Sequence, residues 1–109
     1  NNISPKQVVA SRIISYARAL TNTRGSNVLT LYQLVNNQGE ALEFAAKKQL
    51  PICERPLKDL TIKRNCLIAC IIRGSEVIIP NGNSQIKQGD HVVVVTTHKN
   101  FDDLTDVFA

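Results

Sequence analysis

Hydrophobic positions in the first part of the chain follow the spacing of an α-helix. Apolar residues recur at steps of three and four, which places them on one helix face; they are Val9, Ile13, Tyr16 and Leu20. A capping box, a first-turn proline and a terminating glycine mark the two helix ends: Ser4, Pro5, Gln7 and Gly25. We therefore expect residues 1–25 to form a linking helix and residues 26–109 to form a separate lobe. The apolar helix face needs a partner, which could be this lobe, another subunit or a neighbouring domain.

From Asn27 the apolar spacing changes to two, which is typical of a β-strand. The segment VLTLYQLV (28–35) is mostly apolar on both faces, so it predicts a well-covered strand. NNQG (36–39) is a turn, and EALEFAAKK (40–48) alternates well enough to be the antiparallel return strand. These residues predict a hairpin at the start of the lobe.

The rest of the lobe alternates short strands with turns. PLKDL (56–60) predicts one short helical turn that begins at a proline, and the apolar run CLIACIIR (66–73) predicts a central strand. EVIIP (76–80) and HVVVV (91–95) predict two further strands. The fold class is therefore α+β, with a small mixed or mostly antiparallel sheet.

A C-terminal helix is expected over residues 98–109. Phe101, Leu104 and Phe108 step by three and four along one face. Asn100, or alternatively Thr97, could serve as the N-cap, and the pair Asp102–Asp103 would then be solvated charge in the first turn. This helix would pack its apolar face on the sheet.

Composition and charge exclude several classes of protein. The 109 residues suit one domain, and no apolar run approaches the roughly 18 residues of a membrane span. No secretion signal is visible, and a start at Asn1 without Met suggests a fragment of a longer protein. The net charge of +4 is not clustered, and aromatic residues are scattered, so we do not expect a nucleic-acid partner.

No catalytic or metal-binding residue is predicted. The chain has no nucleophile, zinc or phosphate-loop motif, and Cys53, Cys66 and Cys70 form no C-x-x-C. Cys66 and Cys70 are expected to share one strand face and to pack as small hydrophobes. His91 and His98 would lie on opposite faces of their strand, which is poor geometry for a shared metal ion. An enzyme is therefore not expected.

The segment TIKRN is the candidate binding site. Lys63, Arg64 and Asn65 lie where a loop enters the most apolar strand, a position at which small-molecule sites often form. Lysine and arginine there would suit a phosphate or a carboxylate. The alternative is a solvated turn without a ligand. We take Ile62, Lys63, Arg64 and Asn65 as the candidate ligand turn.

The stretch NGNSQIKQGDHVVVV (81–95) could grip a ligand or simply lead into a buried strand. The second interpretation is the better one, because turn residues and a run of valines explain every position. Ile86 would anchor the loop, Gly89-Asp90 would turn the chain, and the valines would be buried.

Residues 56–108 resemble the C-terminal lobe of the regulator-of-potassium-conductance family, most closely the last such lobe of Trk potassium uptake regulators (the TrkA C-terminal domain). The resemblance rests on L-x-x-L, an apolar strand ending in Arg73, a short strand reaching Pro80, then Ile86 and Gly89-Asp90 before the valines. It covers about residues 27–108, and ISPKQVVASRIISYARA resembles the helix that precedes this lobe in the family.

The resemblance implies a cytoplasmic, non-catalytic regulatory domain at the inner face of the membrane. It implies a homodimer, a larger ring in the full protein, a membrane potassium-translocating subunit as partner, and control of that subunit by ligands. The family binds NAD(H) or ATP and ADP in a Rossmann lobe whose G-x-G-x-x-G is absent here, so no cofactor is expected in this chain. In the Ktr branch the lobe binds cyclic di-AMP at the dimer interface near the turn that corresponds to TIKRN.

Two other functions remain open from the sequence. The lobe could sense a ligand while fused to another cation transporter or antiporter. It could also be an assembly domain that binds no ligand.

Overall fold

The fold is an antiparallel sheet covered by loops and two short helical turns. A computed structural model of the protein describes residues 6–7, 33–34, 36–47, 50–98 and 100–109. Within these ranges, no helix combines the length and the apolar character that crossing a membrane requires. The antiparallel sheet and the short helical turns agree with the predicted α+β class.

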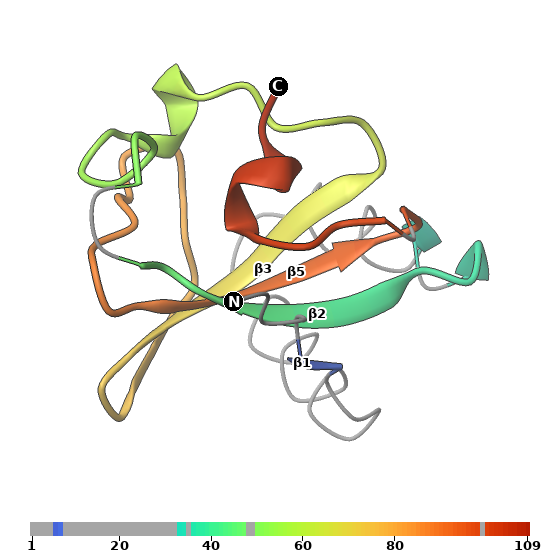
Figure 1. The fold of residues 1–109 in the computed structure, drawn as a ribbon, viewed down its shortest axis with the longest axis horizontal. Coiled ribbons are helices and arrows are strands. Elements are labelled where there is room, and N and C mark those ends of the chain that lie inside the picture. The colour runs from blue at the N-terminus through green and yellow to red at the C-terminus, as the bar shows by residue number, and fades with distance from the viewer. Residues whose placement is uncertain (1–5, 8–32, 35, 48–49, 99) are drawn as a thin grey trace.

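Five strands form one sheet in the order β1-β2-β5-β3-β4, and each neighbouring pair is antiparallel (Figure 1). The strands are β1 Lys6–Gln7, β2 Glu40–Ala45, β3 Cys66–Arg73, β4 Glu76–Ile78 and β5 His91–Thr96. Two 3-10 helices, η1 Leu57–Asp59 and η2 Leu104–Val107, complete the described elements. The predicted strands at 66–73, 76–80 and 91–95 and the helical turn at 56–60 are confirmed, with small changes of their ends.

The four valines of β5 form the centre of the protein. Each is at most 1% exposed, because β5 lies between β2 and β3 and both faces of the sheet are covered. Val92 and Val94 point into the larger core, whereas Val93 and Val95 point into a smaller one. This alternation is the two-residue period of a strand, and it confirms that the valines are buried.

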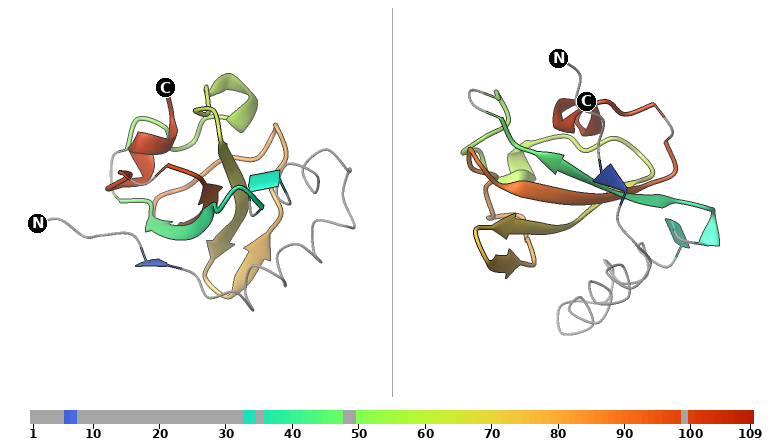
Figure 2. Two further views of the ribbon diagram at one scale, coloured as in Figure 1. Left: turned by 90° about the vertical axis from the view of Figure 1, so that its right-hand side faces the viewer. Right: turned by 60° about the horizontal axis from the view of Figure 1, so that its bottom comes forward.

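The larger core lies between the sheet and the two 3-10 helices. In Figure 1 and in the rotated views of Figure 2, η2 lies over the sheet face formed by β3 and β5. Phe101, Leu104 and Phe108 are at most 9% exposed and belong to this core, so the predicted apolar face of the C-terminal segment is buried. Ile86 is fully buried there as well, as expected for the anchor of its loop.

A β-bulge in β3 corrects the expectation for the cysteines. The register with β5 shifts between Ile68 and Cys70, so one extra residue, Ala69, is inserted at this point. Ala69 and Cys70 consequently both face the smaller core, whereas Cys66 packs against the larger one. The two cysteines therefore lie on opposite faces, because the bulge breaks the simple alternation. The three cysteines, all of them among the described residues, form no disulfide. Burial is the largest influence that raises the pKa of Cys53 and of Cys66.

The N-terminal expectations are wrong where the structure describes them. Lys6 and Gln7 form strand β1 and pair with Glu43 and Leu42, so the helix does not begin at Ser4 with Gln7 in its first turn. The other residues of the expected linking helix and residues 28–32 of the expected first strand lie outside the described residues. Pairing with a distant strand edge can outweigh a local capping signal.

The expected hairpin between 28–35 and 40–48 is also wrong. Gln33, Leu34 and Asn36 are helical, and the Asn37 amide donates to the Gln33 carbonyl at 3.0 Å, an α-helical hydrogen bond. Strand β2 pairs with β5 instead, with Phe44 opposite Val92. The apolar alternation of β2 was informative about burial but not about its partner.

The C-terminal helix is much shorter than expected. Of the described residues in this segment, 98 and 100–109, only Leu104–Val107 are helical. The N-cap is Asp103 rather than Asn100 or Thr97. The Asp103 carboxylate accepts from the Thr105 amide at 2.8 Å, and Asp106 completes a capping box. The Thr105 side-chain hydrogen bond is the main reason that the pKa of Asp103 lies below its ordinary value. Asp102 and Asp103 are both exposed, as predicted for solvated charges. Asp103 in addition caps η2.

Candidate functional site

The backbone of the ligand turn, Ile62–Asn65, is fixed by the C-terminal segment and by the end of β5. Ile62 forms an isolated β-bridge with Phe108, and the Lys63 amide donates to the Val107 carbonyl at 2.8 Å. At the other end of the turn, the Asn65 carbonyl accepts from the Thr97 amide at 3.3 Å. The turn is therefore held from both sides.

The four side chains of the ligand turn do not converge on one point. Ile62 is partly buried and packs against the larger core, whereas Lys63, Arg64 and Asn65 are exposed. Asn65 has a φ of 61°, a left-handed conformation that asparagine adopts more readily than most residues. The turn thus presents an apolar residue to the interior and a basic, polar tip to solvent.

A groove of about 220 Å³ lies beside Ile62. Its lining is mostly apolar, with one lysine and one asparagine: Leu57, Lys58, Ile62, Leu67, Ile68, Pro80, Asn81 and Gly82. Whole-ligand pockets usually measure roughly 300–1,000 Å³, so this groove suits one flat ring or a short chain rather than a complete large ligand.

Backbone hydrogen bonds fix the walls of the groove. The Lys58 amide donates to the Gly82 carbonyl at 2.9 Å, and the Leu57 amide donates to the Ser84 carbonyl at 2.9 Å. Helix η1 is therefore tied to the loop that follows β4. A Cβ at position 82 would lie 3.3 Å from the Lys58 Cβ, so the glycine permits this close approach.

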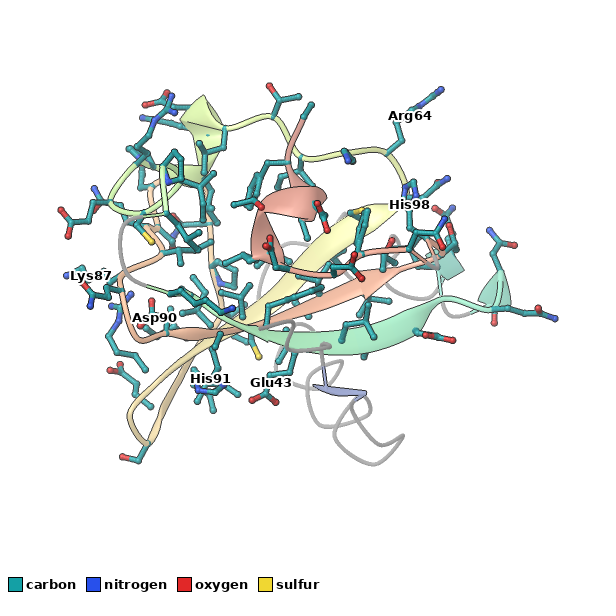
Figure 3. All side chains as sticks on the ribbon, viewed as in Figure 1. Glu43, Arg64, Lys87, Asp90, His91 and His98 are labelled. Carbon is teal, nitrogen blue, oxygen red and sulfur yellow. The ribbon has the colours of Figure 1, made fainter. Side chains whose placement is uncertain are left out.

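Two residues that sequence reasoning did not select lie against the ligand turn. The His98 Nε2 atom lies 2.8 Å from the Arg64 carbonyl oxygen, and the His98 ring stacks on Phe101 with 4.8 Å between centroids. Figure 3 shows Arg64 and His98 at the same end of the sheet. The Lys63 Nζ atom lies 5.5 Å from the Phe101 centroid.

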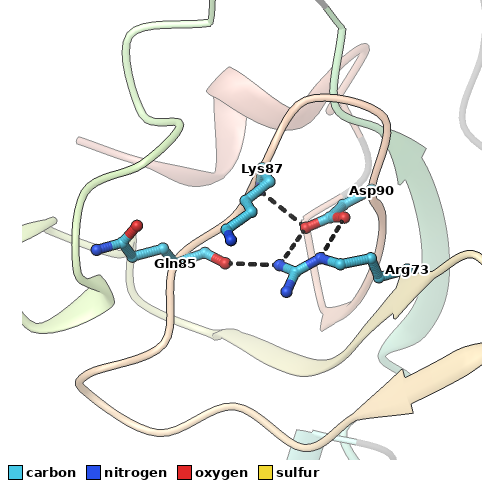
Figure 4. Close-up of polar contacts among 4 residues, drawn as sticks. All are labelled: Arg73, Gln85, Lys87 and Asp90. Atoms are coloured by element: carbon cyan, nitrogen blue, oxygen red, sulfur yellow. Dashed lines mark hydrogen bonds and ion pairs between the residues drawn. The ribbon is translucent and has the colours of Figure 1, made fainter.

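The loop before β5 is organised by an ion pair rather than by a ligand site. Asp90, which is 1% exposed, accepts from the Arg73 Nε at 2.9 Å and from the Arg73 Nη2 at 2.8 Å (Figure 4). The Lys87 amide donates to the same carboxylate at 2.8 Å, and Arg73 Nη2 also donates to the Gln85 carbonyl at 3.1 Å. The loop 85–90 is thereby closed onto the end of β3, which supports the structural interpretation of residues 81–95.

The pKa of Asp90 reflects two opposing influences. Burial is the largest and raises the pKa, but hydrogen bonds from Arg73 and from the Lys87 amide, with the Arg73 charge, together hold it below its ordinary value. The same hydrogen bond raises the pKa of Arg73. Asp90 is therefore an ionised, paired carboxylate.

The two histidines have separate environments. The His91 Nδ1 atom lies 2.9 Å from a Glu43 carboxylate oxygen on the side of the smaller core, far along β5 from His98. Among the described residues, no group of three or more His, Cys, Asp or Glu side chains is close enough to hold a metal ion.

Comparison with known proteins gives a consistent family. The TrkA-C domain model matches residues 42–109. "Trk system potassium uptake protein TrkA homolog 1" of Methanosarcina mazei is 27% identical over 84% of this chain and 19% of its own length. "Trk system potassium uptake protein TrkA homolog 2" of the same organism is 27% identical over 97% of this chain and 22% of its own length. The chain thus spans about a fifth of these relatives.

A solved structure described as "Structure of RCK domain with cda" is similar to this chain, with 25% sequence identity and a TM-score of 0.48. The similarity covers 54% of this chain and 81% of that one. The family model covers the region from β2 to η2, including the ligand turn and the Arg73–Asp90 pair. The chain therefore belongs to the TrkA-C domain family.

Proposed function

We propose that this chain is a non-catalytic regulatory domain of a Trk-type potassium uptake system. The observation that supports it most strongly is the TrkA-C family match over residues 42–109, together with relatives named as Trk potassium uptake proteins. The domain would act at the cytoplasmic side of the membrane, as a homodimer within a larger ring. It would control the membrane subunit that translocates potassium.

Ligand sensing by the turn is the second part of the proposal. The groove beside Ile62 offers an apolar floor with Lys58 and Asn81 at its edges, which suits the flat base of a nucleotide. Lys63, Arg64 and Asn65 would contact polar parts of the same ligand from the turn. NAD(H) or ATP and ADP would bind in a Rossmann lobe elsewhere in the full protein, not in this chain.

The backbone contacts of the turn offer a route from ligand to assembly. Two backbone hydrogen bonds of 2.8 Å join this region to the C-terminal segment: the Lys63 amide donates to the Val107 carbonyl, and the Ala109 amide donates to the Thr61 carbonyl. A ligand that shifts residues 62–65 would act directly on these hydrogen bonds. Such a ligand would favour one arrangement of the C-terminal segment and so bias the dimer toward one geometry. The membrane subunit would respond to that population shift, by an amount set by the ligand's preference between the two states.

Self-association is the first expected outcome. We expect the 109-residue chain to sediment as a dimer at high protein concentration, with the linking segment retained. A monomer at every concentration tested would contradict the proposed assembly.

Ligand binding is tested by calorimetric titration with nucleotides, adenine dinucleotides and cations. Lys58→Gln should weaken binding of any ligand that occupies the groove, whereas Arg55→Gln is a matched control because Arg55 is exposed and does not line it. A chain that dimerises but gives no heat with any compound would favour the assembly domain without a ligand. Fusion to a different cation transporter or antiporter is distinguished by the sequence upstream of residue 1.

A further inference from the structure

The turn that follows β4 contains the dipeptide Asn81-Gly82, and both residues are exposed. In this arrangement the glycine amide nitrogen can attack the asparagine side chain and close a small ring. Glycine favours the attack, because it has no Cβ to crowd the reacting atoms and its backbone is the least restricted. Asparagine precedes glycine only here in the sequence, so the reaction can be followed at one position.

The atoms that would react are free of competing hydrogen bonds. Among the described residues, neither the Gly82 amide nitrogen nor the Asn81 Nδ2 atom has a hydrogen-bond partner. The Asn81 Oδ1 atom accepts from the Asn83 amide at 2.8 Å. Negative charge develops on Oδ1 when the side-chain carbonyl is attacked, and a donor already aimed at that oxygen lowers the barrier.

The backbone around the dipeptide is fixed by groups that the reaction does not use. The Ser84 amide donates to the Asn81 carbonyl at 3.0 Å, and the Asn81 amide donates to the Ser84 hydroxyl oxygen at 2.9 Å. The Gly82 carbonyl accepts from the Lys58 amide at 2.9 Å. The turn is therefore held at both ends, while the reacting groups belong to exposed residues.

We propose that Asn81 is a site of spontaneous deamidation, a modification of the chain that needs only water. The Gly82 nitrogen forms a bond to the Asn81 side-chain carbonyl carbon and loses its proton to a solvent base. The bond from that carbon to Nδ2 breaks, and the nitrogen takes a proton from solvent and leaves as ammonia. Water then adds to one carbonyl of the resulting succinimide, and ring opening gives aspartate or isoaspartate. Amide and water become carboxylate and ammonium, with no oxidation or reduction.

Either product alters the wall of the groove. Asn81 lines the groove together with Lys58, so a carboxylate at position 81 adds a negative charge there and lowers the net charge of +4 by one unit. Isoaspartate also routes the backbone through the side-chain carbon. This lengthening displaces the Gly82 carbonyl from the Lys58 amide and loosens the tie between η1 and the loop after β4. The modification is independent of the proposed function, and only its effect on ligand binding rests on that function.

Ageing of the 109-residue chain in mildly alkaline buffer, followed by digestion and mass spectrometry, tests the proposal. We expect the mass increase from amide to carboxylic acid to accumulate at Asn81, with isoaspartate detected there by an isoaspartyl methyltransferase. The rate should rise with pH, because a base removes the proton of the attacking nitrogen. Asn81→Gln keeps an amide at this position but requires a larger ring, so the mass increase at position 81 should be lost.

Asn83 is the matched internal control, because it is exposed in the same turn but is followed by Ser84, whose side chain crowds the attack. Fragment ions separate the two positions, and Asn81 should convert several-fold faster than Asn83. Equal rates at the two asparagines would overturn the proposal. A parallel sample unfolded in urea tests the role of the turn. Conversion of Asn81 should proceed in the folded chain, and conversion confined to the unfolded sample would also overturn the proposal.

Nucleotide titration separates the modification from the proposed function. Asn81→Asp carries the charge of the product, so it should weaken binding of an anionic ligand in the groove. Asn83→Asp adds the same charge outside the groove lining and is the control. A chain that deamidates at Asn81 but binds no nucleotide refutes ligand sensing and retains the modification site. A chain that binds a nucleotide but keeps the Asn81 amide refutes the modification site alone.

Discussion

Asp90→Ala is expected to lower the free energy of unfolding by about 3 kcal/mol, near the lower end of the cost of breaking a buried ion pair. The substitution removes the carboxylate that accepts two hydrogen bonds from the Arg73 side chain and one from the Lys87 amide. The Arg73 side chain is 36% exposed, so part of its charge regains solvation and the cost stays below that of a fully buried pair. Urea denaturation measures the loss, with Asp102→Ala at an exposed position as the control. A loss below about 1 kcal/mol would contradict the structural role of the pair.

The dependence of stability on acid pH is an independent test of the role of Asp90. Because the pKa of folded Asp90 lies below its ordinary value of 3.8, its ionised form contributes stability above that value. This contribution is lost as the pH falls through the lower, folded pKa. Asp90→Asn should therefore have lower stability near neutral pH and a flatter decline in acid. Parallel acid profiles for the native chain and the variant would be inconsistent with a lowered pKa.

Ile86→Ala is expected to cost about 4 kcal/mol of unfolding free energy, within the range for deleting a buried isoleucine. Ile86 is fully buried in the larger core, and its carbonyl accepts from the Glu54 amide at 2.8 Å. The side chain thus anchors the 81–90 loop on the sheet, and its removal leaves a cavity that fixed neighbours cannot fill.

A graded series separates this cavity from a general disturbance of the loop. Ile86→Val should cost about 1 kcal/mol, since it removes one methylene. Val77→Ala should change stability by less than about 1 kcal/mol, because Val77 is 52% exposed at the edge strand β4. Equal effects at positions 86 and 77 in thermal or urea unfolding would refute the anchoring role.

Local sequence predicted the elements whose partners are close in the chain. The hairpin of β3 and β4 needs only the turn at Gly74, where φ is 62°, and both strands were predicted near their observed ends. The valine strand was predicted because a short apolar run bounded by turn residues has few alternatives. The partner of β2 was missed because its pairing with β5 spans about half of the chain, and no local pattern encodes that choice.

The candidate site was predictable only in part. Lys63 and Arg64 were selected because basic residues at the mouth of an apolar strand form a local pattern. His98 and Phe101 were missed as site residues because only tertiary packing brings them to the ligand turn. The Arg73–Asp90 pair was missed for the same reason. Both residues were noted as family markers, but the sequence of a single strand does not show that the loop before β5 folds back onto the end of β3 and brings them together. The bulge at Ala69 likewise arises from pairing and not from composition.

The most direct test of a regulatory role is the initial rate of potassium uptake by cells whose only Trk-type regulator is the full-length protein carrying this domain. Lys63→Ala with Arg64→Ala should change that rate about 5-fold or more at unchanged protein abundance, the lower end of typical allosteric coupling. The paired control, Lys47→Ala with Arg55→Ala, removes the same charge from exposed positions and should leave uptake as in the native protein. Uptake that is identical in the native protein and both double variants would contradict the account.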